Sequence, residues 1–457
     1  MPIRERLARL VKGFRERVFR VKGDFSIIDW NTVNPIAPAQ YQLLVERQIP
    51  TLEIQVKNTW SIRVDFRLEA RLQGVSVDWH SKTYSIAPNK TDTFRLTLPL
   101  SQEKLFDHEE KNLGLDLRCT YTDPHGKKTE ISDMKLVRVL AKDDMIWAIE
   151  REGNIEDLSH FIAAWVMPRD PEVQKLVHKV ADDAELQSIG GLIGYQETPR
   201  RRVFDKTTTV PPRRIEYFML HLKRGATLTI SLRRVSGGAN SDINFYIFNS
   251  LDFTQFQRTH HTQAYSRFGQ NRVTGRHSES FQADIENDYY LVFDNRFSAL
   301  SRKNIQWHVE EVEPLTHEEI VFIQLGAIYR TVQRNGMKYV NAHISYAPGT
   351  SQRVKRPCDT IRLRGGNCID GSVLFSSCFE AVGFEPIIVI VPGHAFVGVR
   401  TWSDSDRFFF IETTMVSSFS FNDSSLKATQ EFEQNPPTDR KIIDIKKARE
   451  QGIKPLV

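Results

Sequence analysis

The stretch GGNCIDGSVLFSSCFEAVGFEPIIVIVPGHAFVGV, residues 365–399, changes from a helical to an extended pattern and places a cysteine and a histidine where these segments begin. A Gly-Gly-Asn turn precedes Cys368, and the apolar spacing that follows predicts a helix ending at Gly383. The apolar run PIIVIV is far too short to span a bilayer and predicts a buried strand. His394 begins the next strand, so this stretch predicts an α/β core with Cys368 and His394 as a candidate pair.

Cys368 occupies a position where a thiol can become a nucleophile. Nucleophilic attack requires the thiolate, which a helix N-terminus and a neighbouring imidazole both favour. The glycines before Cys368 let the chain turn tightly, and the backbone N–H of a first-turn residue has no partner within the helix. That N–H can help to hold an oxyanion. A lone cysteine at a helix start is more often structural, so the prediction depends on His394 and on an acid beside it.

The acid expected beside His394 is Glu412. The segment WSDSDR, residues 402–407, predicts a hairpin turn, and pairing about its centre sets His394 opposite residues 412–415. Glu412 lies near the end of the second strand of this hairpin, and a carboxylate there can fix the imidazole tautomer and orient the ring. A register slip of one residue would turn Glu412 to the opposite face of the sheet.

The other cysteines are not predicted to hold a metal. Cys378 is expected in the core of the helix that Cys368 begins, and Cys358 in a loop. Zinc bound by Cys358, Cys368, Cys378 and His394 would need widely spaced ligands to converge, whereas ligand pairs at structural zinc sites lie about two to four residues apart. No GxxxxGK[ST] loop and no GxGxxG motif after a strand occurs, so no nucleotide site is expected. Neither a metal nor a cofactor is therefore expected.

The rest of the chain divides by pattern into a multidomain α+β protein. Period-two alternation in TLEIQVKN predicts an immunoglobulin-like β-sandwich, and NIEDLSHFIAAWVMP and DPEVQKLVHKVADDAE have helical period with Asp170 as an N-cap. A second β-rich region follows the linker-like PRRRVFDKTTTVPPRR, and its DINFYIF and YYLVFDN segments resemble those of GOLD-type sandwich domains, which are interaction modules. The predicted order is a basic amphipathic helix over 1–29, a sandwich over 30–142, a helical connector over 143–199, a GOLD-like sandwich over 200–313, an α/β unit over 314–425 and a short helix or loop over 426–457.

The motifs GGNCIDGSVLFSS, PGHAFVGV and FFFIETT resemble the transglutaminase-like superfamily, which belongs to the papain-like fold class. The resemblance covers residues 314–425, and FIAAWVMPRDPEVQKLV resembles a segment that precedes such domains in some bacterial multidomain proteins, which makes the GOLD-like sandwich an insertion. It implies Cys368 as nucleophile, His394 as general base and Glu412 as the orienting acid. Members usually carry Asp or Asn at the third position, and Glu is one methylene longer.

Three further residues are candidates to support the reaction. Asp370 is expected either to stabilise the helix start or to bind a neighbouring loop, and Asn367 either to donate to an oxyanion or to shape the turn. Gln352, in GTSQRVKRP, resembles a glutamine that precedes the cysteine motif in related bacterial domains. That resemblance implies an amide that donates to the oxyanion or to the substrate.

Composition limits the partners and the compartment. The net charge of +5 over 457 residues is mild, so no nucleic-acid partner is expected. Four cysteines without dense spacing and no visible secretory signal predict a reducing, cytoplasmic location. Residues 1–22 have an apolar stripe opposite basic residues, which suits a membrane surface, a protein partner or packing on the next domain.

The function predicted from the sequence is acyl transfer at a protein or peptide amide through a thioester on Cys368. With water as the acceptor, the chain is a cysteine peptidase or amidase, and with an amine as the acceptor it is a transamidase. Hydrolysis is the favoured hypothesis because it needs no second substrate site. The alternative is a catalytically inactive transglutaminase-like scaffold whose β-sandwiches carry the function.

Overall fold

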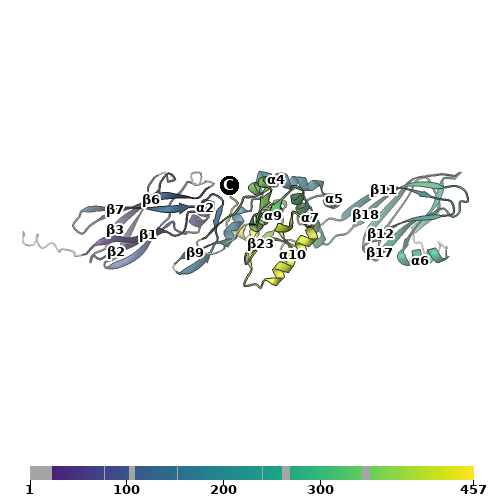
Figure 1. Cartoon of the computed structure of the whole chain (residues 1–457). Helices are drawn as coiled ribbons and strands as arrows, with labels where there is room; N and C mark the ends of the chain where they lie inside the picture. The colour runs from purple at the N-terminus through teal and green to yellow at the C-terminus, as the bar shows by residue number, and fades with distance from the viewer. Residues whose placement is uncertain are drawn as a thin grey trace, which may run out of the picture.

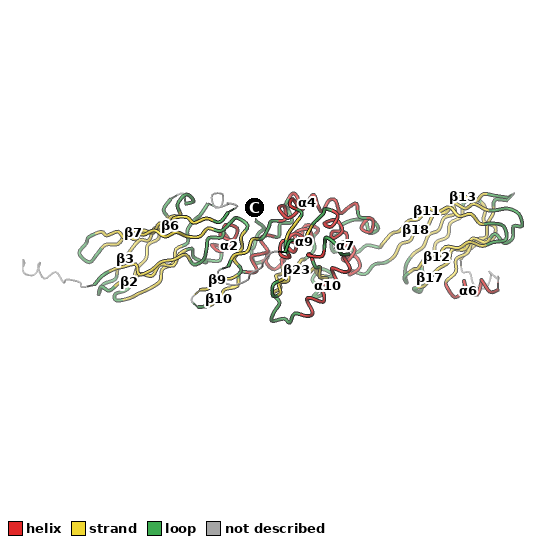
Figure 2. The backbone as a smooth tube through the Cα atoms, viewed as in Figure 1, coloured by secondary structure: helices red, strands yellow, loops and turns green. Residues whose placement is uncertain are grey.

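The computed structural model describes residues 23–76, 78–101, 109–151, 153–238, 240–259, 268–341 and 350–456. They form an elongated molecule with a β-sandwich at each end and a mixed α/β unit between them (Figure 1). Figure 2 shows that both ends are built mainly from strands and that most helices gather in the middle. The predicted multidomain, β-rich architecture is present, whereas the basic helix predicted at residues 1–22 lies outside the described residues.

The N-terminal sandwich packs a three-stranded sheet, in the order β1-β2-β5, on a four-stranded sheet, in the order β4-β3-β6-β7. The strands are β1 (Phe25–Thr32), β2 (Leu52–Asn58), β3 (Val64–Leu72), β4 (His80–Ile86), β5 (Lys90–Leu96), β6 (Lys111–Thr122) and β7 (Lys128–Val139). Along β3 every second side chain is buried, which is the predicted period of two. β1 begins before the predicted boundary at residue 30. Helix α2 (Pro38–Glu46) is an addition to the predicted scheme, and it has no side-chain cap that would mark its start.

The connector between the first sandwich and the second begins with strands instead of a helix. β8 (Asp144–Ile146), β9 (Ala148–Arg151) and β10 (Asn154–Asp157) precede the 3-10 helix η1 (Ser159–Trp165), so the helix predicted over NIEDLSHFIAAWVMP is wrong in its first part. The cause is pairing, because β9 bonds to β10 and β8 bonds to a strand some 200 positions along the chain, β20 (Ser351–Arg353). The predicted helices follow as α4 (Pro171–His178), η2 (Lys179–Asp182) and α5 (Ala184–Gln187), and the Asp170 carboxylate caps α4 by accepting from the Glu172 N–H at 2.8 Å.

The second sandwich pairs two four-stranded sheets, in the orders β11-β18-β13-β16 and β12-β17-β14-β15. Its elements are β11 (Arg200–Val210), β12 (Ile215–Leu222), β13 (Thr227–Ser236), β14 (Asp242–Asn249), α6 (Ser250–Thr259), β15 (Phe268–Thr274), β16 (His277–Gln282), β17 (Asn287–Asp294) and β18 (Lys303–Glu313). The segment interpreted as a linker is therefore wrong, because β11 pairs with β18 along its whole length. β11 is an edge strand, and the charged, exposed residues typical of such edges hide its strand character in the sequence.

The central α/β unit is built around a four-stranded antiparallel sheet in the order β24-β23-β22-β25. Its elements are α7 (His317–Arg334), β19 (Lys338–Tyr339), β20, α8 (Pro357–Leu363), β21 (Gly365–Gly366), α9 (Cys368–Val382), β22 (Pro386–Val391), β23 (His394–Arg400), β24 (Phe408–Ile411), η3 (Thr413–Met415), α10 (Phe421–Gln434), β25 (Lys441–Asp444) and α11 (Ile445–Glu450). α9 packs on one side of the sheet, where Val397 and Val399 meet Phe375 and Phe379, and α10 covers Phe396 and Phe410 on the other. α9 is almost wholly buried, as expected for a helix that is apolar around most of its circumference.

The C-terminal segment is part of this sheet rather than a tail. β25 pairs antiparallel with β22, and α10 runs across residue 425, so the predicted short helix or loop over 426–457 is wrong. Only Ile443 of β25 is buried, and a four-residue strand with one core residue has too little pattern to be visible in sequence. Among the residues that the structure describes, no helix is long and apolar enough to cross a membrane.

Candidate active site

Cys368 is the first residue of α9, and a reciprocal capping box fixes the helix start there. The Asn367 side chain accepts from the Asp370 N–H at 2.9 Å, and the Asp370 carboxylate accepts from the Asn367 N–H at 3.1 Å. Asn367 is thus engaged as a helix cap, the turn role considered for it. Cys368 itself is 1% exposed, so its thiol lies inside the fold.

Gly371 brings the first turn of α9 against the segment that follows β24. A Cβ on Gly371 would lie 2.6 Å from the Thr413 Oγ1, a distance that real Cβ contacts do not show. The Thr413 hydroxyl donates to the Cys368 carbonyl oxygen at 3.4 Å. Glu412 immediately precedes Thr413, so this close approach also sets the distance between the acid and the cysteine. The sequence signal for this close approach is a glycine inside a buried helix. It can be interpreted only once the helix is known to pack against the segment that follows β24.

His394 and Glu412 form a short hydrogen bond. The imidazole Nε2 lies 2.6 Å from the Glu412 Oε2, and the other carboxylate oxygen accepts from the Thr414 N–H at 2.9 Å and from its hydroxyl at 2.6 Å. β23 and β24 pair Val397 with Ile411, within the register expected from the turn. The expected contact between His394 and Glu412 is therefore confirmed, and Thr414 is an added support that the sequence prediction missed.

The environment of His394 favours the imidazolium. Burial disfavours the charge, but hydrogen bonding to Cys368 and Glu412 and the negative charges on both outweigh it and raise the pKa of His394 to about 10. Burial alone would raise the pKa of Glu412, yet the hydrogen bond and charge of His394, with the Thr414 donors, lower it. Because Nε2 is bonded to Glu412, Nδ1 is the nitrogen that remains for the thiol.

The surroundings of the other three cysteines raise the pKa of their thiols, mainly through burial. Burial raises the pKa of Cys119 and of Cys378 to about 12 in each case. Burial, followed by the charges of Asp170 and Asp359, raises the pKa of Cys358 to about 11. These three thiols therefore stay protonated near neutral pH.

Gln352 presents a buried amide donor beside Trp147. It is the middle residue of β20 and 7% exposed, and its Oε1 accepts from the Trp147 indole N–H at 3.1 Å. Its Nε2 is buried and has no hydrogen-bond partner among the residues described. Trp147, to which the amide bonds, and Cys368 both belong to one large buried cluster. No signal in the sequence links Trp147 to Gln352, and the prediction missed it.

Asp370 does both things that the sequence left open. Besides capping α9, its Oδ1 accepts from the Lys355 N–H at 2.8 Å, and its Oδ2 lies 3.5 Å from the Lys355 ammonium. Burial raises the pKa of Asp370, against the opposing effect of the Lys355 and Asn367 N–H donors. The carboxylate is 2% exposed and fully engaged, so Asp370 binds the neighbouring segment of the protein instead of a substrate.

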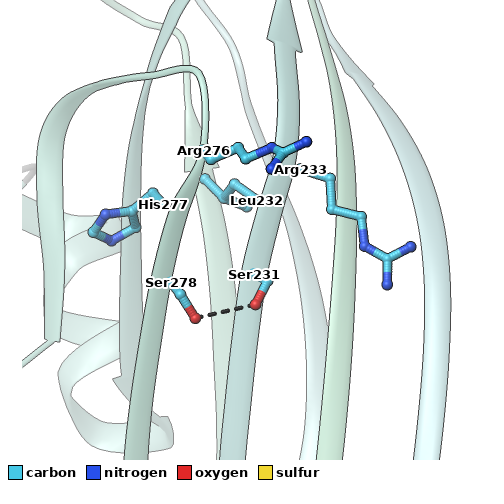
Figure 3. Close-up of a pocket in the computed structure, with 6 residues that line it drawn as sticks. All are labelled: Ser231, Leu232, Arg233, Arg276, His277 and Ser278. Atoms are coloured by element: carbon cyan, nitrogen blue, oxygen red, sulfur yellow. Dashed lines mark hydrogen bonds between the residues drawn. The ribbon is translucent and has the colours of Figure 1, made fainter.

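A polar depression of about 520 Å³ lies on the second sandwich, lined by Ser231, Leu232, Arg233, Arg276, His277 and Ser278 (Figure 3). The two serine hydroxyls bond to each other at 3.0 Å, and the His277 ring points away from both of them. His277 is therefore not placed as a base for either serine. Within the described ranges, no group of three or more His, Cys, Asp or Glu residues is placed to hold a metal ion.

No protein-family model matches the chain, and no curated protein matches it. Among solved structures, the periplasmic inhibitor of g-type lysozyme PliG from Aeromonas hydrophila is 14% identical over 25% of this chain and 86% of its own, with a TM-score of 0.16. Tripeptidyl peptidase 2 is 8% identical over 66% of this chain and 21% of its own, with a TM-score of 0.18. The secreted serine protease VesC from Vibrio cholerae is 9% identical over 55% of this chain and 45% of its own, with a TM-score of 0.16. The chain thus spans less than half the length of either protease, and likeness at these TM-scores carries no argument about function.

Proposed function

We propose that the chain is a thiol-dependent acyl-transfer enzyme that acts on protein or peptide amides, with Cys368 as the nucleophile. The observation that carries the proposal is the 2.6 Å bond between His394 and Glu412, which leaves the second imidazole nitrogen for a cysteine at the N-terminus of α9. A cysteine that begins a helix, with a histidine at the start of a strand and an acid just beyond the end of the next strand, also supports membership in the papain-like fold class and its transglutaminase-like branch.

In the first half of the reaction the Cys368 thiolate attacks the carbonyl carbon of the amide. The electron pair of the C=O bond moves to oxygen, and the oxyanion accepts from the Cys368 N–H and from the unpartnered Nε2–H of Gln352. The intermediate collapses as the C–N bond breaks, and His394 gives its Nδ1 proton to the leaving amine. A thioester on Cys368 and a neutral imidazole remain.

In the second half the neutral imidazole takes a proton from the acceptor. With water, the hydroxide that forms attacks the thioester carbon, the same donors hold the oxyanion, and the C–S bond breaks to release a carboxylic acid. The thiolate and the imidazolium are restored together. We favour water over an amine because hydrolysis needs no second substrate site.

Glu412 keeps the imidazole in place through both halves. Its carboxylate holds Nε2–H and stabilises the imidazolium, and it is itself held by the two Thr414 donors. A glutamate is long enough here because Glu412 lies just beyond the end of β24, at the N-cap of η3, rather than within the strand.

An inactive scaffold is the second candidate function, and the 1% exposure of Cys368 is an observation that favours it. The measurement that separates the two is iodoacetamide labelling of each cysteine as a function of pH, read by mass spectrometry. An enzyme requires that Cys368 label rapidly at pH 6 while Cys119, Cys358 and Cys378 do not, and that Cys368 lose this reactivity in His394→Ala. A Cys368 as inert as the other three would reject the enzyme and leave the scaffold.

A further inference from the structure

Trp147 bonds to the Gln352 amide, and Asp370, from a different part of the fold, bonds to the segment that follows Gln352. We propose that Trp147 and Asp370 are positioning residues, which together hold the Nε2–H of Gln352 in register with the Cys368 thiol. The proposal rests on the function proposed above, because it takes Gln352 as a donor to the oxyanion that forms at Cys368. Both residues are expected to affect the binding of that oxyanion and not the formation of the thiolate. Neither residue touches the reacting atoms.

Trp147 determines which end of the amide is free. An indole N–H is a donor only, so the amide atom that faces it at 3.1 Å must be the oxygen. Once Oε1 is fixed in this way, Nε2 points to the other side, where it has no partner in the described protein. Trp147 is 1% exposed and lies directly after β8, the strand that pairs Met145 with Gln352, so ring and amide are positioned by the same ladder.

Asp370 determines where the backbone of the Gln352 segment lies relative to α9. Its Oδ1 accepts from the Lys355 N–H at 2.8 Å. Lys355 lies three residues after Gln352, and Asp370 lies two residues after Cys368. The Lys355 ammonium continues the link by donating to the Gly365 carbonyl oxygen at 3.1 Å. One carboxylate therefore joins the strand with the amide donor to the turn that precedes the nucleophile.

The packing around Asp370 leaves little room for this link to shift. A Cβ on Gly366 would lie 2.6 Å from the Asp370 Cβ, so only glycine allows the turn to come this close. Between Gln352 and Lys355, the Val354 N–H donates to the Asp143 carbonyl at 2.9 Å, and the Val354 carbonyl accepts from the Trp165 indole at 3.1 Å. The bonds of Val354 to Asp143 and Trp165 thus hold the segment directly beside the Lys355 N–H that bonds to Asp370.

A purely structural role for Asp370 would resemble that of Asp423, which closes the capping box of α10. Among the described residues, the Asp423 carboxylate accepts from the N–H and the hydroxyl of Ser420, and that box is exposed. Asp370 occupies the same N3 position but is buried and extends to Lys355. Asp423→Asn is therefore a matched control for Asp370→Asn, since both change the same group in the same motif.

The experiment uses the full chain and N-acetylglycinal, a small peptide aldehyde whose carbonyl carbon bonds to the thiolate and whose oxygen takes the place of the oxyanion. Its affinity is read from the protection of Cys368 against iodoacetamide, and the labelling rate without aldehyde reports the thiolate alone. We expect Gln352→Ala to weaken the aldehyde about 100-fold. Trp147→Phe and Asp370→Asn should each weaken it about 10-fold with the labelling rate retained. Either change combined with Gln352→Ala should weaken it no further than Gln352→Ala alone.

Several outcomes would overturn the positioning roles of Trp147 and Asp370 and leave the proposed role of Cys368 unaffected. These are a wild-type Cys368 that labels rapidly but gains no protection from the aldehyde, unchanged affinity in the Trp147 and Asp370 variants, losses that add fully to that of Gln352→Ala, or an equal loss in Asp423→Asn. If Asp370→Asn does not fold, Asp370→Ser, which is smaller and keeps one acceptor for the Asn367 N–H, is measured in its place. A wild-type Cys368 that does not label rapidly would instead reject the proposed function.

Discussion

The central unit and the second sandwich each bring a histidine near a possible nucleophile, and the outcomes are opposite. In the sandwich, His277 and Ser278 are neighbours on one strand, and alternation along a strand sends their side chains to opposite faces. The His277 ring meets Phe245 of the core at 6.4 Å between ring centres, and the Ser278 hydroxyl bonds to Ser231 outside it. In the central unit, Cys368 and His394 come from a helix start and a strand start, and both point to the same place.

The difference lies in what orients the imidazole. His394 has a carboxylate at 2.6 Å that is almost fully buried, whereas the Nε2 of His277 lies 3.0 Å from the Glu279 carboxylate, which is 26% exposed and makes no hydrogen bond with it. A carboxylate shielded from water interacts strongly with an imidazolium, because the effective dielectric constant is low. Proximity of residue types is therefore not enough to make a site, and the predictions below test the orienting contacts one at a time.

Removing the imidazole should have the largest effect. His394→Ala takes away the cation that favours the Cys368 thiolate, and we expect the iodoacetamide labelling rate of Cys368 at pH 6 to fall about 100-fold or more. His277→Ala is the matched control and should leave that rate unchanged. The comparison between the two regions fails if the two histidine variants behave alike.

Weakening the carboxylate should have a smaller effect. Glu412→Gln keeps the shape of the side chain but removes its charge, so the imidazolium loses its counter-charge and the labelling rate at pH 6 should fall about 10-fold. Thr414→Val removes one of the two donors to the carboxylate and should lie between wild type and Glu412→Gln. A Glu412→Gln protein that labels like wild type would mean that Cys368 does not depend on this acid.

The hairpin part of the site was predictable because its cause is local. A turn at residues 402–407 and an alternating pattern on both sides set the register that brings Glu412 to His394, and these signals lie within twenty residues. The helix start at Cys368 was equally local, because Asn367 and Asp370 form its capping box within four residues.

The remaining parts of the site depend on contacts that no local pattern encodes. Trp147 reaches Gln352 across 205 positions, beside a strand pair between β8 and β20 that joins segments far apart in the sequence. β11 was hidden for a different reason, since a charged edge strand has the composition of a linker. Local propensity decides an element only where distant pairing does not compete with it.

The close approach at Gly371 can be tested by adding a single methyl group. Gly371→Ala would place a Cβ 2.6 Å from the Thr413 Oγ1, and the forced shift should lower the free energy of unfolding by about 1–3 kcal/mol. Gly326→Ala in α7 is the control, because there the new Cβ would meet the end of the Arg330 side chain and the Phe421 ring at 3.1 Å, which is less severe. Urea denaturation of both variants gives the comparison, and an equal cost at the two positions would show that Gly371 is not special.

The last prediction concerns the pH dependence of stability. The pKa of His394 is raised to about 10 in the folded protein, whereas an unfolded histidine titrates near 6.5. Below about pH 6.5 both states hold the proton and the stabilisation is complete, and it is lost as the pH rises through about 10, because there the folded state must give up a proton that the unfolded state has already lost. Urea unfolding of wild type and His394→Ala between pH 6 and pH 10 isolates this contribution, since the other titrating groups are shared. The stability difference should shrink as the pH rises, and a difference that stays constant would mean that His394 is neutral in the folded protein, which would also remove the electrostatic reason for a thiolate at Cys368.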